Sequence, residues 1–205
     1  MTGGKGQRSE QTKNKIVEAA HALFIENGYA GTTFQAVADA AGVSVQTVYF
    51  HYGSKSRLLR RVVDAASAGD GEPGPLLDRP SFAALREPAD PATAIRLWVR
   101  ESGAVLDRVA PVLTVVRDAA PGDPDMAAQW ADDSARRRAA HGAFIAVLTG
   151  LHAVRHGLSE RRAVDVAVAL LSPELFLVLT RECGWTAAEW EGWAADQLAH
   201  ALLPG

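Results

Sequence analysis

The side chains best suited to bind a polyanion gather between positions 33 and 55. Gln46 and Thr47 carry groups that can bond base edges, and a glutamine can bond adenine through two hydrogen bonds. Tyr49, His51 and Lys55 carry groups that can bond phosphate oxygens. These residue types within so short a segment predict contact with a nucleic-acid duplex, provided that the fold presents them on one face.

Four helices joined by short turns are predicted to position these side chains. An apolar stripe that includes Ile16, Leu23 and Phe24 predicts the first helix, and hydroxyl residues suited to N-caps begin the others. The expected elements are 11–27, 33–40 with a capping box of Thr32 and Gln35, 45–51 capped by Ser44, and a fourth helix capped by Ser54. The second and third helices meet at the small Ala38 and turn at Gly42, which is the pattern of a helix-turn-helix. Such a unit presents its second helix to the major groove of DNA.

The charge of the chain is divided between its two ends. The formal net charge of the 205 residues is −3 at pH 7. Residues 1–63 hold eight basic and four acidic side chains, a net charge of +4, whereas residues 64–205 carry −7. A basic first part therefore agrees with a polyanionic partner for that part alone. Arg57, Arg60 and Arg61 are interpreted as a solvated face rather than as direct contacts.

A resemblance to a known family is carried by residues 15–59, which read KIVEAAHALFIENGYAGTTFQAVADAAGVSVQTVYFHYGSKSRLL. The Asn-Gly-Tyr run, Thr32-Thr33, Ala-Gly-Val-Ser, Thr-x-Tyr-x-His-Tyr and Ser-Lys make this segment similar to the N-terminal domain of the TetR family of bacterial transcriptional regulators. The resemblance implies a homodimeric repressor whose larger domain binds a small molecule and dimerises through its last two long helices. It departs from the family at Gln46, where a small residue is common, and at Tyr52, where phenylalanine is more usual.

The resemblance also implies roles for individual residues of the DNA-binding part. Contacts to the DNA backbone are expected from Thr33, Tyr49, His51 and Lys55. Side chains that face the groove are expected at Gln35, Val45, Gln46 and Thr47, and Ser44 at the start of the same helix belongs to this interface.

The rest of the chain predicts a second, larger helical domain. Residues 67–91 are rich in Gly and Pro and predict a connector, with one short helix near Phe82–Leu85. Beyond it, helices are expected over 91–108, 111–119, 124–150, 159–182, which Pro173 should kink or divide, and 186–203. The expected all-α protein thus has a DNA-binding domain over residues 1–66, with a flexible arm over about 1–10, and a ligand-binding and dimerisation domain over residues 67–205.

Two sets of apolar residues are assigned to functions of this second domain. The candidates to line a ligand cavity are Trp98, Leu113, Met126, Trp130, Phe144 and Leu148, although each of them taken singly fits plain core better. The candidates for a dimer interface are Val164, Val168, Leu171, Leu175, Leu179, Trp190, Trp193 and Leu198.

Catalytic and metal chemistry finds little support in the sequence. The one cysteine, Cys183, excludes an intramolecular disulfide and a cysteine metal cluster. His152 and His156 are four residues apart, a spacing that on one helix could place two imidazoles on one metal, but such a pair is usually a polar face. No phosphate-binding glycine loop and no nucleophile motif occurs. We therefore expect no enzyme, no metal and no cofactor.

Membrane insertion and secretion are likewise not expected. The most apolar stretch, residues 163–180, contains Asp165, Pro173 and Glu174, and the N-terminus is polar. The expected protein is soluble, cytoplasmic and regulates transcription, most simply as a homodimeric repressor that binds a palindromic DNA operator and is released by a small-molecule effector. The alternative is a helical sensor of a small molecule or metal that does not bind DNA.

Overall fold

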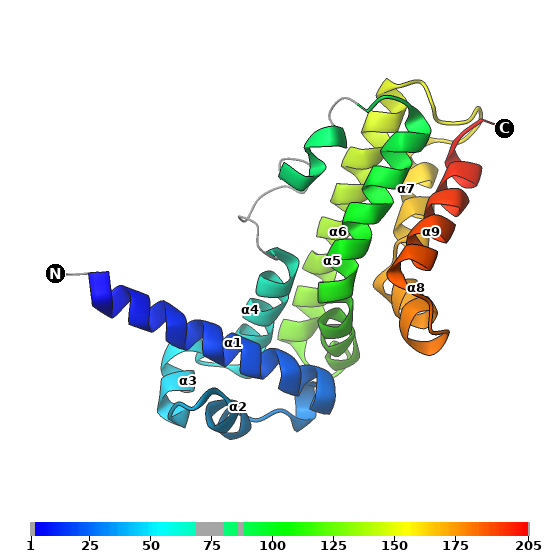
Figure 1. Ribbon diagram of the computed structural model, residues 1–205. Coiled ribbons are helices and arrows are strands. Elements are labelled where there is room, and N and C mark those ends of the chain that lie inside the picture. Colours follow the sequence, from blue (N-terminus) through cyan, green and yellow to red (C-terminus); the bar gives the residue numbers. More distant parts are fainter. Residues whose placement is uncertain (1–2, 69–79, 86–87, 205) are drawn as a thin grey trace. The chain divides into compact units, whose positions relative to one another are not determined.

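Helices account for every regular element that the structure describes (Figure 1). The computed structural model describes residues 3–68, 80–85 and 88–204. Over these ranges the predicted all-α fold is confirmed. The elements are α1 (Gly3–Gly31), α2 (Phe34–Ala41), α3 (Val45–Tyr52), α4 (Lys55–Ala68), the 3₁₀ helix η2 (Pro80–Leu85), α5 (Pro91–Ala119), α6 (Pro124–Gly150), α7 (Glu160–Leu170), α8 (Pro173–Leu177), the π-helix η3 (Val178–Glu182) and α9 (Ala187–Leu202).

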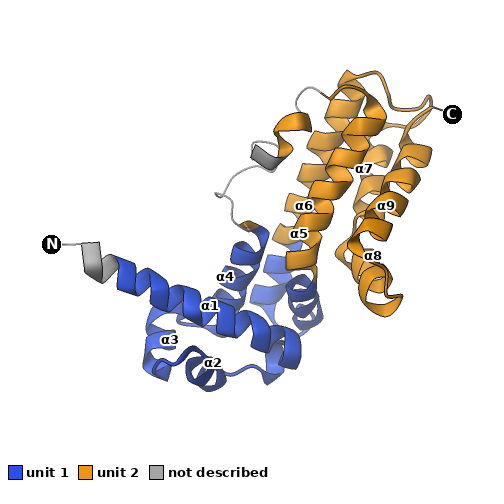
Figure 2. Cartoon of the chain, viewed as in Figure 1, with its two compact units in different colours: residues 1–67, 111–131 blue, residues 68–110, 132–205 orange. Residues whose placement is uncertain are grey.

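These helices form two compact units that do not simply follow the order of the chain (Figure 2). Unit 1 comprises residues 1–67 and 111–131, and unit 2 comprises residues 68–110 and 132–205. The long helices α5 and α6 each contribute one segment to each unit. The functional division at residue 66 stays a prediction, but the packing of unit 1 extends beyond it in sequence.

Unit 1 contains the predicted helix-turn-helix, formed by α2 and α3. The backbone N–H of Ala36 donates to Thr33 Oγ1 at 3.1 Å, and that of Thr47 donates to Ser44 Oγ at 3.2 Å, so each helix begins at a hydroxyl cap. Gly42 joins them with a φ of +67°, which glycine adopts without a Cβ clash. The fully buried residues that α1 to α4 contribute to this unit include Ile16, Ala20, Phe24, Val37, Ala38, Val48, Leu58 and Leu59.

The entry into α2 corrects one detail of the sequence prediction. Thr32 was expected to form a capping box with Gln35, but the cap is Thr33. Thr32 is 1% exposed, and its hydroxyl donates to the carbonyl oxygens of Leu23 and Gly28 at 3.0 and 2.8 Å. The Thr32 hydroxyl therefore closes the end of α1, where Gly28 has a φ of +68° and interrupts the helix.

Helix boundaries elsewhere differ from expectation at Pro111 and at the N-terminus. One helix, α5, replaces the two predicted over 91–108 and 111–119, because the fixed φ of Pro111 fits a helix and removes only one backbone donor. Pro173 divides the helix predicted over 159–182, as expected, since α7 ends before it and Ser172 caps α8. Residues 3–10, predicted as an arm, belong to α1.

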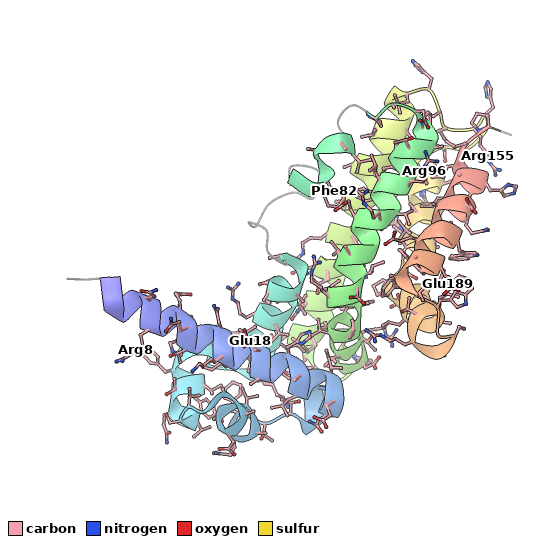
Figure 3. All side chains as sticks on the ribbon, in the orientation of Figure 1. Arg8, Glu18, Phe82, Arg96, Arg155 and Glu189 are labelled. Atoms are coloured by element: carbon pink, nitrogen blue, oxygen red, sulfur yellow. The ribbon has the colours of Figure 1, made fainter. Side chains whose placement is uncertain are left out.

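Unit 2 is built around aromatic side chains. The Trp98 ring stacks on Phe144 with centroids 4.8 Å apart and an interplanar angle of 1°. Phe82, which Figure 3 labels on η2, meets Trp98 edge-on at 5.5 Å. Phe176 meets Trp190 edge-on at 5.0 Å. Such pairs add to the hydrophobic burial and fix η2, α5, α6, α8 and α9 against one another.

The last helix of unit 2 begins as the sequence predicts. Thr186 and Glu189 form a reciprocal capping box at the start of α9, where Figure 3 labels Glu189. The segment Glu160–Glu182 is long and apolar enough to cross a membrane by length and composition. It is nevertheless broken at Leu171 and Ser172 between α7 and α8, so it is not one continuous helix.

Enlarging Gly103 on α5 should destabilise unit 2. A Cβ at this position would lie 2.8 Å from Cζ3 of the fully buried Trp190, so the helices must shift to accept it. We expect Gly103→Ala to lower the free energy of unfolding by about 1–3 kcal/mol, measured by urea denaturation. Gly142→Ala on α6, where a Cβ meets nothing within 4 Å, is the matched control and should be neutral or stabilising. Equal stability of both variants would contradict close packing of α5 on α9.

Candidate nucleic-acid interface

The exposed face of α3 presents the predicted base-reading and phosphate-binding groups together. Gln46 and Tyr49 are exposed, and Thr47 is half-buried. Val48 and Tyr52 point into the core of unit 1 instead, at 0% and 9% exposure. The helix therefore separates its apolar face from a face that is polar apart from one phenylalanine.

Tyr49 lies on the surface of unit 1 and is not a core aromatic. Its ring meets Phe34 edge-on, with centroids 4.6 Å apart, and 57% of the residue remains exposed. Phe34 packs against the Tyr49 ring and restricts its position, while the rest of the residue is exposed. Tyr52, the departure from the family pattern, is buried, and its hydroxyl donates to the carbonyl oxygen of Lys13 at 3.3 Å.

The N-terminal turns of α2 and α3 supply further polar groups. Thr33 is exposed and caps α2, whose first N–H groups favour anions. Gln35 is exposed, and its Nε2 donates to Asp39 Oδ1 at 2.8 Å. The hydroxyls of Ser44 and Thr47 lie 2.8 Å apart, so these two side chains are held in one conformation. Val45 is half-buried beside them.

Two predicted phosphate ligands lie at the C-terminal end of α3 and the start of α4. His51 is half-buried, with its ring centroid 5.3 Å from that of Phe50. Lys55 is the first residue of α4, and its Nζ lies 4.6 Å from the centroid of the Tyr29 ring. A cation over an aromatic face at this distance is attracted by the ring quadrupole.

Sequence reasoning missed Phe50, which is the most exposed large apolar side chain that the structure describes. It lies on α3 between Tyr49 and His51, and 83% of it is exposed. The signal was available, because Phe50 falls outside the phase of the buried Val48 and Tyr52 on the same helix. With the exposed Tyr49 beside it, Phe50 adds an aromatic part to the otherwise polar face of α3.

A basic hollow adjoins this end of α3. It encloses about 470 Å³ and is lined by Lys13, Phe50, His51, Tyr52, Gly53, Arg57, Arg60, Arg61 and Asp64. The three arginines are exposed, as the sequence predicts. Their common position beside His51 gives the hollow an excess of positive charge, which suits a polyanion.

Comparison with known proteins finds a family match for the part of the chain that contains α2 and α3. Residues 16–62 match the family model described as bacterial regulatory proteins, tetR family. The chain carries a TetR-family domain. The resemblance predicted from the motifs is therefore confirmed over the helix-turn-helix and its two flanking helices.

Two curated relatives each match little more than a quarter of the chain. The HTH-type transcriptional regulator TtgR of Pseudomonas putida is 32% identical over 59 residues, which are 29% of this chain and 28% of the relative. The HTH-type negative transcriptional regulator IcaR of the icaADBC biofilm operon of Staphylococcus epidermidis is 35% identical over 52 residues, 25% of this chain and 28% of the relative. The chain thus matches little more than a quarter of the length of each.

Solved structures share the fold along nearly the whole chain. NalD of Pseudomonas aeruginosa, the secondary repressor of the MexAB-OprM multidrug efflux pump, superposes with a TM-score of 0.71 at 18% identity, over 95% of this chain and 98% of its own. PfmR of Thermus thermophilus, a TetR-family transcriptional regulator, gives a TM-score of 0.69 at 23% identity, over 92% and 99%. At these identities the likeness shows the fold alone, and it confirms the predicted helix-turn-helix domain followed by a helical domain.

The six residues predicted for a ligand pocket divide between the two units. Trp98, Phe144 and Leu148 lie in unit 2, whereas Leu113, Met126 and Trp130 lie in the segment that belongs to unit 1. All but Trp130 are at most 3% exposed, and Trp98 and Phe144 stack on each other. These contacts are those of core residues, so a pocket role for the six stays a prediction.

Buried polar groups of unit 2 are a second feature that the sequence reasoning missed. Asp133 and His141 on α6 and Ser102 on α5 are 6–7% exposed. Trp98 Nε1 donates to His141 Nδ1 at 3.3 Å, and burial, with the charges of Arg137 and Arg138, lowers the pKa of His141 to about 4. Its imidazole is therefore neutral at pH 7. The eight-residue spacing of Asp133 and His141 on α6 was the available signal.

The predicted dimer-interface residues differ in how much surface they retain. Four are already buried inside unit 2 and have almost no surface left for a second chain: Val164, Leu171, Trp190 and Leu198. Four are only half-buried and retain surface: Val168, Leu175, Leu179 and Trp193. Only the second group can lose substantial exposed area on association.

The metal-binding interpretation loses its geometric basis at His152 and His156. α6 ends at Gly150, and His152 has a φ of +53°, so the two imidazoles are not one turn apart on a helix. Among the described residues, no group of three His, Cys, Asp or Glu side chains is placed to hold a metal ion.

Proposed function

We propose that the protein is a transcriptional regulator that binds duplex DNA through α3 and acts as a repressor in the cytoplasm. The observation that carries this proposal is the face of α3, where Gln46, Thr47, Tyr49 and Phe50 point away from a well-packed core. An α-helix fits the major groove of B-DNA, and groups near its N-terminus reach base edges there. The TetR-family match over residues 16–62 supports the same function.

A second copy of the chain would complete the operator-binding species. The half-exposed apolar side chains Val168, Leu179 and Trp193, which pack at the edge of the core of unit 2, are suited to such an interface. A symmetric pair of α3 helices about 34–36 Å apart, or a multiple of that distance, would match a palindromic operator.

A small-molecule effector would release the DNA. Buried polar groups in unit 2, namely Ser102, Asp133 and His141, could bond the polar atoms of such a molecule. If the effector binds better to a conformation that does not bind DNA, linkage requires that it lower the affinity for DNA.

The proposal is tested by fluorescence anisotropy with the full chain. The probes are a labelled duplex recovered by selection from a random-sequence library and a scrambled duplex of equal length. We expect the protein to bind the selected duplex more tightly than the scrambled one. The logarithm of the binding constant should fall linearly with the logarithm of the salt concentration, with a slope of about −0.9 for each neutralised phosphate. Weak, equal binding to both duplexes after selection would overturn the proposal and favour a helical sensor that does not read DNA.

Substitutions on α3 and α4 should separate sequence reading from backbone contact. Lys55→Ala removes a phosphate ligand and should weaken binding to both duplexes by about the same factor, with the salt slope reduced by about 0.9. Gln46→Ala removes an amide that can bond adenine and should change the sequences recovered by selection. A uniform loss on Gln46→Ala, with the preferred sequence unchanged, would contradict the role of Gln46 in reading bases.

A further inference from the structure

The ammonium group of Lys55 is held in place by unit 1 before any DNA is bound. Its Nζ lies 4.6 Å from the Tyr29 ring centroid and donates to the carbonyl oxygen of Ala30 at 3.4 Å. A lysine side chain has four rotatable bonds, and restricting them in advance lowers the entropy lost when the lysine binds a phosphate. The position of the Tyr29 ring therefore sets where the charge of Lys55 is presented.

Tyr29 is itself fixed by the residue that immediately precedes α6. Its hydroxyl donates to Asp123 Oδ2 at 2.9 Å. The other oxygen of the same carboxylate, Oδ1, accepts from the backbone N–H groups of Asp125 and Met126 at 2.9 and 3.3 Å. One carboxylate thus caps α6 and holds the ring on which Lys55 lies. The donor stays protonated and the acceptor stays ionised at neutral pH, since burial raises the pKa of Tyr29 and the hydrogen bond from Tyr29 lowers the pKa of Asp123.

A second hydrogen bond joins the start of α4 directly to the first turn of α6. Ser56 follows Lys55 on α4, is 6% exposed and donates through Oγ to Asp125 Oδ2 at 2.8 Å. Two consecutive residues at the start of α4 are therefore connected to the first turn of α6, Lys55 through Tyr29 and Ser56 directly. All of these residues belong to unit 1, so the connection lies within one packed body.

We propose that Tyr29 and Asp123 are positioning residues that hold Lys55 for a DNA phosphate and make DNA affinity depend on the first turn of α6. The inference rests on the proposed DNA-binding function and names a path for its regulation. Displacement of the α6 cap moves Asp123, frees the Tyr29 ring and leaves Lys55 without its support. The contact that is weakened is one to a DNA phosphate, so the loss of DNA affinity is the same for every DNA sequence.

The test is a double-mutant cycle between Tyr29 and Lys55 in the full chain. Tyr29→Phe keeps the ring and removes only the hydroxyl that bonds Asp123. Anisotropy with the selected duplex and the scrambled duplex should show a loss of affinity of about three- to tenfold on Tyr29→Phe, equal for the two probes. In the Lys55→Ala background, Tyr29→Phe should have no further effect, because the residue through which it acts is gone.

Tyr52→Phe is the matched control. It removes another tyrosine hydroxyl of unit 1, the one that donates to Lys13, without touching Lys55. Its effect on affinity should be the same with and without Lys55. Equal losses for Tyr29→Phe in the two backgrounds would reveal a purely structural role and overturn the inference, as would an unchanged affinity. Failure of the unmodified protein to bind either duplex would overturn the proposed function instead, and this inference with it.

Discussion

A Phe50→Asp variant should bind the selected operator duplex about a hundredfold more weakly than the unmodified protein, because a carboxylate on the helix that we propose enters the groove is repelled by the phosphates. Phe50 is 83% exposed, so its replacement removes little buried apolar area. The free energy of unfolding should therefore change by no more than about 0.5 kcal/mol. Anisotropy titrations and urea denaturation of the same preparation measure the two effects separately.

The position of Phe50, rather than the added charge, must be shown to cause this loss. Ile25→Asp is the matched control, since it replaces another exposed apolar residue of unit 1, on α1, with the same change in net charge. It should weaken binding far less. Phe50→Ala then isolates the ring, whose apolar contact with a thymine methyl would favour particular sequences. Equal weakening by the two aspartates would remove Phe50 from the interface.

Most of the helix-turn-helix could be predicted from the sequence because its signals are local. The apolar stripe around Ile16, the left-handed turn at Gly42 and the cap at Ser44 each depend on a few neighbouring residues, and the structure has all three. The exposure of Phe50 was available in the same way, from its phase on α3. It was overlooked because, from residue 46 onward, only polar residue types were considered as ligands.

The cap of α2 shows where local reasoning fails. Both Thr32 and Thr33 can act as an N-cap, and Gln35 made Thr32 the better candidate on spacing alone. Burial decided otherwise, since Thr32 is turned inward onto carbonyl oxygens of α1 and only Thr33 is exposed. The choice depends on a contact between helices that no short window of sequence contains.

The helical domain was less predictable because the period of apolar residues shows that a helix face is buried, but not whether the same chain, a ligand or a second chain buries it. Trp190 and Leu198 satisfy the pattern of a dimer seam, yet they are fully buried within their own unit. Leu113 and Met126 satisfy the pattern of a pocket lining but pack with unit 1. Only the half-exposed residues of the same stripes, such as Trp193, retain surface for a partner, and this distinction requires the fold.

The buried His141 should make the protein less stable as the pH falls below its usual pKa. The folded state lowers the pKa of His141 to about 4, against about 6.5 in the unfolded chain. Between these values the unfolded state binds more protons than the folded state, so the free energy of unfolding rises with pH and is lost on acidification. The full effect between pH 6.5 and pH 4 is about 3 kcal/mol, at 1.36 kcal/mol per pKa unit.

Comparison with His141→Gln isolates this effect from the carboxylates that titrate over the same range. A glutamine can accept the hydrogen bond from Trp98 Nε1, but it does not take up a proton. The free energy of unfolding is measured by urea denaturation at pH 7.5, 6 and 5. Below pH 6.5 it should fall more steeply for the unmodified protein than for the variant, and above pH 6.5 the two proteins should change by the same amount. His156→Gln, at an exposed histidine, should follow the unmodified protein throughout. Parallel curves for all three proteins would mean that His141 takes up a proton as readily in the folded state as in the unfolded chain. A neutral His141 could then not be the acceptor for Trp98 over this pH range.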